Sequence, residues 1–483
     1  MTQDLPRQAG TARGDATTSP GAAPGRPGPH QPAGRFVAAV EHVIKGPVWG
    51  CQMCGQCILH DTGFTCPMTC PKQMRNGPCG GVGPNGECEV LPDRTCVWLK
   101  AYERARRAPW GRHIQRLHPA VDWELQGSSS WLNFLSGKDH HHDIQPVSLV
   151  HRDTVMRSGG KLEKMLREGQ WVTIGELNPP DGGELSSFAS IASSLSRYAD
   201  VMSVTEHPGA QNHMSSLPAA ALLQGMGIET IATFTCRDRN RIALQGDLLG
   251  AAGLGIKNVL LVTGNHMSVG DHPGAKPVFD LDSVNLIRLA RRLRDDGVYD
   301  SGRALQSRPR LLLGCATAPF APPTQVRASR LAKKIAAGAD YAISQHVFDI
   351  ARWQEFVREL SLVGPPEDFR LLGAVAVLPS LEVARTLNQT LHGFTIPEAI
   401  LRRLAGARDP QAEGIKIAAE TISELRSMPE VSGCLVAALS GGEHVMTSHL
   451  SEVEVVQAVI AEAGLPSGPA PSPTGPDSPG DDS

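Results

Sequence analysis

The sequence Trp171-Val-Thr-Ile-Gly-Glu-Leu-Asn-Pro-Pro180 decides the fold. Its first seven residues are a strand-length, mostly apolar run, and the Asn-Pro-Pro that follows is a strong loop signal. Glu176 is the one charged residue of the run and stands near its carboxyl end. The pattern predicts a buried strand that carries a carboxylate at its carboxyl end.

Similar runs recur along the chain and alternate with helix-like segments. The eight runs are Trp171–Leu177, Asp200–Thr205, Ile228–Phe234, Asn258–Thr263, Leu311–Ala316, Asp340–Gln345, Arg370–Val377 and Cys434–Leu439. The helix-like segments include Leu185–Tyr198, Asn240–Gly253, Asp280–Asp295, Pro323–Ala337 and Gln411–Arg426. Eight strands alternating with helices over about 300 residues predict an α/β fold of the (β/α)8 TIM-barrel class. An open, doubly wound sheet is the alternative, but no Gly-x-Gly-x-x-Gly follows the first strand.

A barrel of this class places its active site at the carboxyl ends of its strands. The residues expected there are Glu176, Thr205, Thr235, Gly264 with Asn265, Ala316 to Pro319, and Gln345. A partly desolvated Glu176 is suited to work as a general acid. A glutamate that only caps a loop is the alternative, and spacing alone does not separate the two.

Composition excludes several classes of protein. The chain has 483 residues, of which 41% are hydrophobic and 20% charged, and its formal net charge is −3. A whole-chain nucleic-acid surface would be strongly basic. No apolar run approaches the roughly 20 residues that cross a bilayer, and the first residues contain no secretory signal. We therefore expect a cytoplasmic protein that binds neither nucleic acid nor membrane.

Composition also changes along the chain, which suggests an order of domains. Pro- and Gly-rich ends predict disordered tails at residues 1–34 and 466–483. Between them we expect a Cys-rich metal-binding domain at 35–125, a linker at 126–160 and the barrel at 161–465. The linker contains Asp139-His-His-His-Asp143, which is read as an ordinary polar loop with a His-rich metal site as the alternative.

Eight of the 11 cysteines fall in one short segment. They are Cys51, Cys54, Cys57, Cys66, Cys70, Cys79, Cys88 and Cys96. A reducing compartment does not hold such a cluster as disulfides, so metal ligation is the prediction. Eight thiolates suffice for two sites of four. Spacing alone leaves zinc and an iron–sulfur cluster such as [4Fe-4S] open.

The barrel region resembles the methylenetetrahydrofolate reductase family from roughly Lys161 to Ser440. The matching motifs are Ile174-Gly-Glu-Leu-Asn-Pro-Pro180, Ser203-Val-Thr205, Phe234-Thr-Cys-Arg-Asp-Arg-Asn240, Gly270-Asp-His-Pro-Gly-Ala-Lys-Pro277, Ala337-Gly-Ala-Asp340 with Gln345, and Phe394-Thr-Ile-Pro397. The resemblance implies a flavin-bearing barrel of one-carbon folate metabolism, on the route to methionine. In such a barrel, hydride passes from NAD(P)H through FAD to methylenetetrahydrofolate and yields methyltetrahydrofolate.

Site residues follow from the same resemblance. Glu176 corresponds to the general acid that opens the folate ring, and Gln345 to the folate-contacting glutamine. The flavin positions correspond to Thr205, Thr235, Gly264, Asn265 and, near the phosphate end, Lys334.

The chain departs from the family pattern at Thr233, Asn265 and Ala318. Asn265 replaces an aspartate beside the flavin, so the flavin potential is expected to rise. These departures favour an alternative, a folate-binding methyl-transfer or accessory protein without redox chemistry, whereas Glu176 favours the reductase.

The Cys-rich segment resembles a second family, the methylenetetrahydrofolate reductase C-terminal domain. The match includes Cys51-Gln-Met-Cys-Gly-Gln-Cys57 and Arg75-Asn-Gly-Pro-Cys-Gly-Gly81. Relatives of this domain are partner subunits of the reductase and are linked with zinc and iron–sulfur binding. Fusion keeps the module near the barrel, and the linker is long enough for it to fold back, so we expect it close to the barrel's C-terminal face, as an electron relay or as a structural or docking element. A redox partner protein and a homo-oligomer are both compatible with the sequence.

Overall fold

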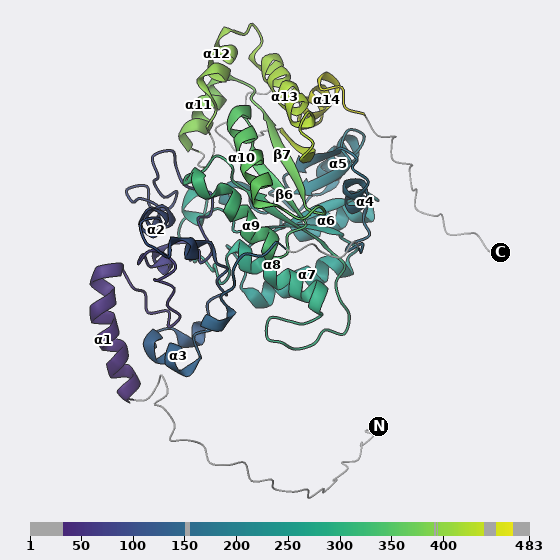
Figure 1. Ribbon diagram of the computed structural model, residues 1–483. Helices are drawn as coiled ribbons and strands as arrows, with labels where there is room; N and C mark the ends of the chain where they lie inside the picture. Colours follow the sequence, from purple (N-terminus) through teal and green to yellow (C-terminus); the bar gives the residue numbers. More distant parts are fainter. Residues whose placement is uncertain (1–31, 150–154, 391–392, 394, 439–450, 467–483) are drawn as a thin grey trace, which may run out of the picture.

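The computed structural model describes residues 32–149, 155–390, 393, 395–438 and 451–466. Eight parallel strands close into a barrel in the order in which they occur in the sequence, which confirms the predicted fold class (Figure 1). They are β1 (Val172–Leu177), β2 (Val201–Val204), β3 (Thr230–Thr235), β4 (Asn258–Val262), β5 (Leu312–Thr317), β6 (Tyr341–His346), β7 (Arg370–Val377) and β8 (Val431–Ala438).

Helices surround the barrel and follow its strands. They are α4 (Lys161–Arg167), α5 (Ser186–Leu195), α6 (Ser216–Gly225), α7 (Arg241–Gly253), α8 (Ser283–Arg291), α9 (Arg327–Ala337), α10 (Ile350–Val363), α11 (Leu381–Thr390), α12 (Glu398–Gly406), α13 (Pro410–Arg426) and α14 (Glu452–Glu462). Among the described residues, none of the helices combines the length and the apolar character needed to cross a membrane.

Local capping explains where two of these helices begin. Asn240 accepts hydrogen bonds from the backbone of Ile242 and Ala243, and so starts α7. Asp282 accepts from the backbone of Asn285, so α8 begins at Ser283 rather than at Asp280. Both side chains satisfy backbone N–H groups that a helix leaves without partners.

Ring closure depends on β8, which begins earlier than its apolar run suggests. The run was expected from Cys434, but β8 pairs with β7 from Val431 and with β1 at Gly433. A Cβ at Gly433 would collide with the Val172 carbonyl of β1. A glycine is therefore required where the first and last strands meet closely.

A separate lobe precedes the barrel and lies against it (Figure 1). It contains α1 (Pro32–Trp49), the eight clustered cysteines, α2 (Val97–Ala105), the short 3-10 helix η2 (Gly111–Gln115) and α3 (Ser130–Ser136). The lobe is mostly irregular, with a small hydrophobic core around Met74, Val82 and Trp98. The tails expected at 1–34 and 466–483 lie outside the described residues, except that α1 begins at Pro32.

The segment expected to be a linker, residues 126–160, differs from that expectation. Helix α3 lies within it, and Ser129 and Ser130 each donate a hydrogen bond to the buried carboxylate of Glu41 in α1. Lys45 completes this network through an ion pair with Glu41 at 2.6 Å. A buried carboxylate must be paired and hydrogen-bonded. These serines therefore stabilise the buried Glu41 and are not spacer residues.

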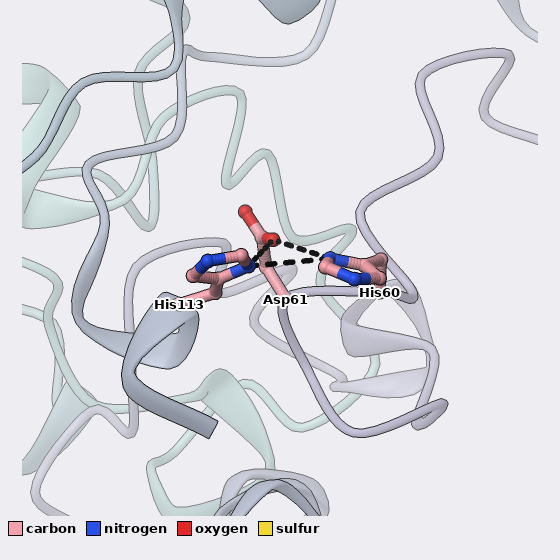
Figure 2. A group of neighbouring side chains, drawn as sticks. All are labelled: His60, Asp61 and His113. Atoms are coloured by element: carbon pink, nitrogen blue, oxygen red, sulfur yellow. Dashed lines mark hydrogen bonds and ion pairs between the residues drawn. The ribbon is translucent and has the colours of Figure 1, made fainter. Parts of the chain in front are cut away.

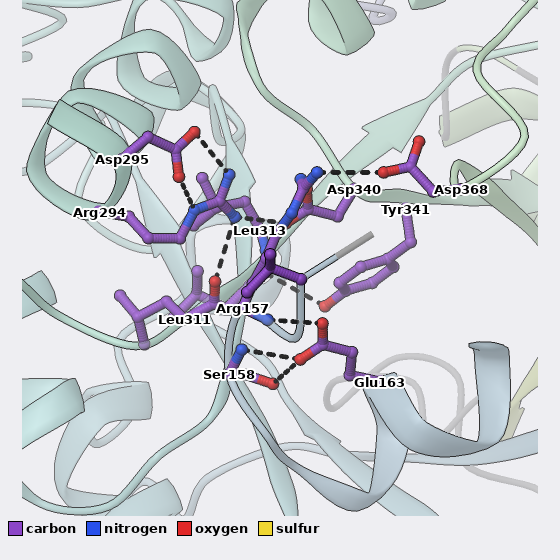
Figure 3. Close-up of polar contacts among 12 residues, drawn as sticks. Arg157, Ser158, Glu163, Arg294, Asp295, Leu311, Leu313, Asp340, Tyr341 and Asp368 are labelled. Atoms are coloured by element: carbon purple, nitrogen blue, oxygen red, sulfur yellow. Dashed lines mark hydrogen bonds and ion pairs between the residues drawn. The ribbon is translucent and has the colours of Figure 1, made fainter. Parts of the chain in front are cut away.

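An ion network closes the N-terminal end of the barrel (Figure 3). Asp340, just before β6, accepts from Arg294 at 2.6 Å, from the Leu313 backbone at 2.8 Å and from Arg157. Arg157 also contacts Asp368 at 3.0 Å. The network ties the segment that enters the barrel to β5 and β6, on the face opposite the candidate site.

Candidate functional site

The structure brings six of the expected site residues to the carboxyl ends of the barrel strands. They are Glu176 in β1, Thr205 after β2, Thr235 in β3, Gly264 and Asn265 after β4, and Gln345 in β6. Glu176 and Gln345 are half-buried, whereas Asn265 is exposed. Glu176 and Gln345 come from strands three apart in the ring, so they stand across the barrel mouth from each other.

The ends of β1 and β2 are joined by hydrogen bonds. The Thr205 backbone donates to the Leu177 carbonyl at 3.0 Å, and its hydroxyl donates to the Asn178 side chain at 2.8 Å. On the neighbouring strands, Gly264 takes a φ of +87°, and a Cβ there would lie 3.0 Å from Thr235 Cβ. The left-handed backbone and the close approach together require glycine at this position.

Gln345 presents an unsatisfied acceptor at the barrel mouth. Its Oε1 is buried and has no hydrogen-bond partner among the residues that the structure describes. A Cβ at Gly393 would collide with the Gln345 amide and with the carbonyl of Gly80, so only glycine lets the chain pass between them. A buried acceptor without a partner is costly, and a ligand N–H group would satisfy it.

The Cys-rich lobe covers part of this face, as expected. Lys72 Nζ donates to the Gly264 carbonyl at 2.8 Å and forms an ion pair with Glu89. On the other side of the contact, Asp282 accepts from the backbone N–H groups of Arg75 and Asn76 at 3.0 and 2.9 Å. The lobe is therefore fixed to the ends of β4 and α8 by buried polar contacts.

Helix α9 carries three cations, two of which face the same contact. Lys333 Nζ donates to the Ile114 carbonyl of the lobe at 2.8 Å, and burial lowers its pKa to about 8. Burial also lowers the pKa of Arg330 to about 10, and Arg330 lies near Cys79 and Cys96. Lys334 Nζ donates to the Ala316 carbonyl of β5 at 2.6 Å.

The cysteines separate into two sets of four. Cys51, Cys54, Cys57 and Cys66 line one small pocket of the lobe. Cys70, Cys79, Cys88 and Cys96 form the second set, in which Cys96 is within electrostatic range of Cys70, Cys79 and Cys88. Burial raises the pKa of Cys66 and Cys79 to about 11, so a metal ion would have to displace protons from them.

The spacing of the sulfur atoms distinguishes between metals. Among the described residues, which include all eight cysteines, no three of these sulfur atoms lie within 4.8 Å of one another. Tetrahedral zinc with bonds of about 2.3 Å holds its thiolates about 3.8 Å apart. A zinc ion would therefore require at least three thiolates of a set to move closer together than they lie here.

Sequence reasoning missed the polar residues that hold this face together. Glu206, after β2, is buried and pairs with Arg239 at 2.7 Å, and Asp238, after β3, pairs with Arg237 at 2.8 Å. The cations of α9 were also missed, apart from Lys334. The available signal was the position of these residues directly after strands, where a barrel concentrates function.

Comparison with known proteins gives two family matches. Residues 161–450 match the model described as methylenetetrahydrofolate reductase, and residues 33–124 match the one described as methylene-tetrahydrofolate reductase C terminal. A "probable methylenetetrahydrofolate reductase (NADPH)" of Caenorhabditis elegans is 25% identical over 193 residues, which are 37% of this chain. The match spans only 26% of that relative's length.

Solved structures give weaker likenesses. A Clostridium thermocellum protein that binds two copies of 5-methyl-5,6,7,8-tetrahydrofolic acid is 14% identical, covers 63% of this chain and 98% of its own, and has a TM-score of 0.44. An oxaloacetate acetylhydrolase bound to 3,3-difluorooxalacetate is 13% identical, covers 65% and 96%, and has a TM-score of 0.35. Neither likeness bears on function.

Fold and site together define a (β/α)8 barrel whose C-terminal face is shared with a Cys-rich lobe. The matched region covers more than half of the sequence. The chain belongs to the methylenetetrahydrofolate reductase family, which confirms the resemblance seen in its motifs.

Proposed function

We propose that this protein reduces the methylene bridge of 5,10-methylenetetrahydrofolate to a methyl group at the C-terminal face of the barrel. Family membership supplies the reaction class. The observation that carries the proposal to these residues is the buried, unpartnered Oε1 of Gln345 across the mouth from Glu176. A pterin ring offers the N–H donors that such an acceptor needs.

Glu176 is the proposed general acid. Its proton passes to the ring nitrogen that leaves the methylene carbon, the C–N bond breaks, and the remaining nitrogen and carbon form an iminium ion. A hydride then adds to that carbon and gives the methyl group. The C. elegans relative is named for NADPH, so a nicotinamide nucleotide is the proposed source of the hydride.

Replacing Gln345 tests the proposed substrate contact. Gln345→Leu removes the acceptor while keeping the side chain's bulk, so we expect KM for the folate to rise roughly 5- to 100-fold, the effect of a lost buried hydrogen bond. Steady-state kinetics measure it, with Gln457→Leu on the exposed face of α14 as the matched control. A Gln345 variant with unchanged KM would remove this residue from the folate site.

Two of the positions expected to hold FAD make other contacts in this structure. Lys334, expected near the phosphates, donates to the Ala316 carbonyl, and the Gly264 carbonyl is taken by Lys72 of the lobe. The Lys72 contact joins the lobe to one position expected for the cofactor, whereas the Lys334 contact lies within the barrel. Flavin dependence stays a prediction, and no step is assigned to a flavin.

The same observation favours a second candidate, a folate-binding methyl-transfer or accessory protein without redox chemistry.

One experiment separates the reductase from this second candidate. Protein purified without oxygen is incubated with methylenetetrahydrofolate and NADPH, NADH or a reduced dye, and methyltetrahydrofolate is measured by chromatography. Product with any donor supports the reductase. Tight folate binding without product from any donor would support the second candidate. The absorbance spectrum of the same sample reports bound flavin.

We also propose that both cysteine sets hold iron–sulfur clusters rather than zinc. The wide sulfur spacing supports this, and so does Arg330, whose buried Nη1 has no hydrogen-bond partner beside the second set. A nearby cation offsets the negative charge of four thiolates. A bound cluster would supply one-electron transfer at this face.

Metal analysis of protein isolated without oxygen tests this assignment. We expect about eight iron atoms per chain, four for each set of four cysteines, together with acid-labile sulfide. Cys79→Ser should lower iron by about half, while Cys236→Ala in the barrel should leave it unchanged. Zinc as the only metal in the wild-type protein would overturn the iron–sulfur assignment.

A further inference from the structure

Three side chains of the lobe, outside both cysteine sets, converge on one point (Figure 2). His60 and Asp61 lie between Cys57 and Cys66, and His113 lies in η2. His60 Nδ1 is 3.2 Å from Asp61 Oδ1 and 3.3 Å from His113 Nδ1. The third side of the triangle, from His113 Nδ1 to Asp61 Oδ1, is 3.5 Å.

These distances match one face of a tetrahedral metal site. Bonds of about 2.0 to 2.1 Å from zinc to nitrogen or oxygen place neighbouring ligand atoms about 3.3 to 3.4 Å apart. All three sides of the observed triangle lie close to that length. His60 is 54% exposed and His113 30% exposed, so a fourth corner beyond the triangle is open to solvent.

The residues behind the triangle hold it in place. Asp61 is almost completely buried, and its second oxygen, Oδ2, is 3.0 Å from Nε2 of the buried His118. Burial alone would raise the pKa of Asp61, but this hydrogen bond and the neighbouring cations hold it below its usual value. The His60 ring stacks on Trp110 with centroids 5.0 Å apart. Such supporting contacts are typical of metal ligands.

The guanidinium of Arg116 contacts the triangle and opposes a metal ion there. Its Nη1 lies 3.5 Å from Asp61 Oδ1, and its Nη2 lies 3.0 Å from His113 Nε2. A neutral histidine that binds metal through Nδ1 carries its proton on Nε2 and can no longer accept from Arg116. Arg116 and a metal ion therefore compete for His113, and Arg116, 34% exposed, has room to move outward.

We propose that His60, Asp61 and His113 form a binding site for a divalent transition metal ion of the zinc class, with one open coordination position and with Arg116 as the competing cation. Two imidazoles and one carboxylate suit Zn²⁺, Co²⁺ and Fe²⁺. The open position would take water or a small anionic ligand, as in zinc sites with three protein ligands. This site is independent of the proposed folate chemistry.

Cobalt binding by the full-length protein, isolated without oxygen and with its cysteine sets loaded, tests the proposal. Co²⁺ is added, loose metal is removed by gel filtration, and bound cobalt and its visible spectrum are measured. We expect one added Co²⁺ per chain, with the bands of a nitrogen and oxygen site and no thiolate charge-transfer band. Wild-type protein that retains no added cobalt, or only thiolate-bound cobalt, would overturn the site.

Variants locate the metal ion and test the competition. The double change His60→Ala with His113→Ala should abolish the added cobalt, whereas His142→Ala, in an exposed polar loop of the same lobe, should retain it. Unchanged iron content shows that the lobe remains folded.

His118→Asn should weaken cobalt binding by roughly 10- to 100-fold, the effect of losing a supporting contact. Arg116→Gln should tighten binding. Equal affinity in Arg116→Gln would overturn the competition, and cobalt retained by the double variant would overturn the site.

Discussion

Glu176→Gln is expected to lower the turnover of methylenetetrahydrofolate by roughly 100-fold or more, the usual effect of losing a general acid. The amide has nearly the same shape as the carboxylic acid but has no proton to give to the leaving nitrogen. Because the proton is needed before hydride can add, the loss should appear in kcat, while folate binding remains close to that of the wild type. Product formation by chromatography and folate binding by calorimetry measure the two effects separately.

Glu184→Gln provides the matched control. Glu184 follows the same strand but is fully exposed, so its replacement should leave turnover unchanged. Unchanged turnover in Glu176→Gln, in protein that makes methyltetrahydrofolate at all, would assign the acid to another group. It would leave Glu176 as a residue that caps the loop after β1.

Asp340→Ala is expected to destabilise the folded protein by about 1.5 to 3 kcal/mol, the usual scale for losing a buried hydrogen bond to a charged group. The change removes one of the two carboxylates that pair with the almost completely buried Arg294, leaving Asp295 as its partner, and removes the acceptor of the Leu313 backbone N–H. Denaturant unfolding of anaerobic protein, followed by circular dichroism, measures the loss. Asp296→Ala, at an exposed position nearby, should change stability little.

The same experiment separates two roles for Asp340, which belongs to a motif of the family resemblance. The residue lies at the N-terminal end of the barrel, where barrels keep residues for stability rather than chemistry. We therefore expect the folded fraction of the variant to bind folate normally. A variant of wild-type stability with impaired folate binding would contradict this assignment.

The barrel could be predicted from the sequence because its strands are nearly continuous apolar runs. Each observed strand lies within a few residues of its predicted run, since burial on both faces leaves little room for polar residues. β8 was the least accurate because Val431, Ser432 and Gly433 do not form an apolar run. Their place in the sheet follows from pairing with β7 and β1, which is long-range information.

The contact between lobe and barrel could not be predicted in detail. Lys72, Arg330 and Lys333 are residue types that normally face water, and nothing local marks them as buried. Their burial depends on partners that lie far away in the sequence, such as the Gly264 and Ile114 carbonyls. The fusion and the length of the intervening segment predicted the general position of the lobe and left the contacts open.

The arrangement of the cysteines could also be predicted only in part from the sequence. Their number and spacing predicted metal ligation, but the division into two sets requires the chain path of the lobe. The serines of the expected linker were misleading because Ser129 and Ser130 are typical spacer residues by composition. Their role is defined by Glu41, which lies 88 and 89 residues earlier in the chain.

The contacts of Lys72 have a consequence for how this protein is made. Lys72 and the Gly264 carbonyl that it binds are separated by 192 residues, and Ile114 and Lys333 by 219. At roughly 5 to 20 residues per second, a ribosome needs about 10 to 40 s to span that interval. The lobe thus leaves the ribosome with its thiols and cationic contacts uncovered, well before α9 exists. Docking of the lobe can therefore begin only after about 200 further residues have been synthesised.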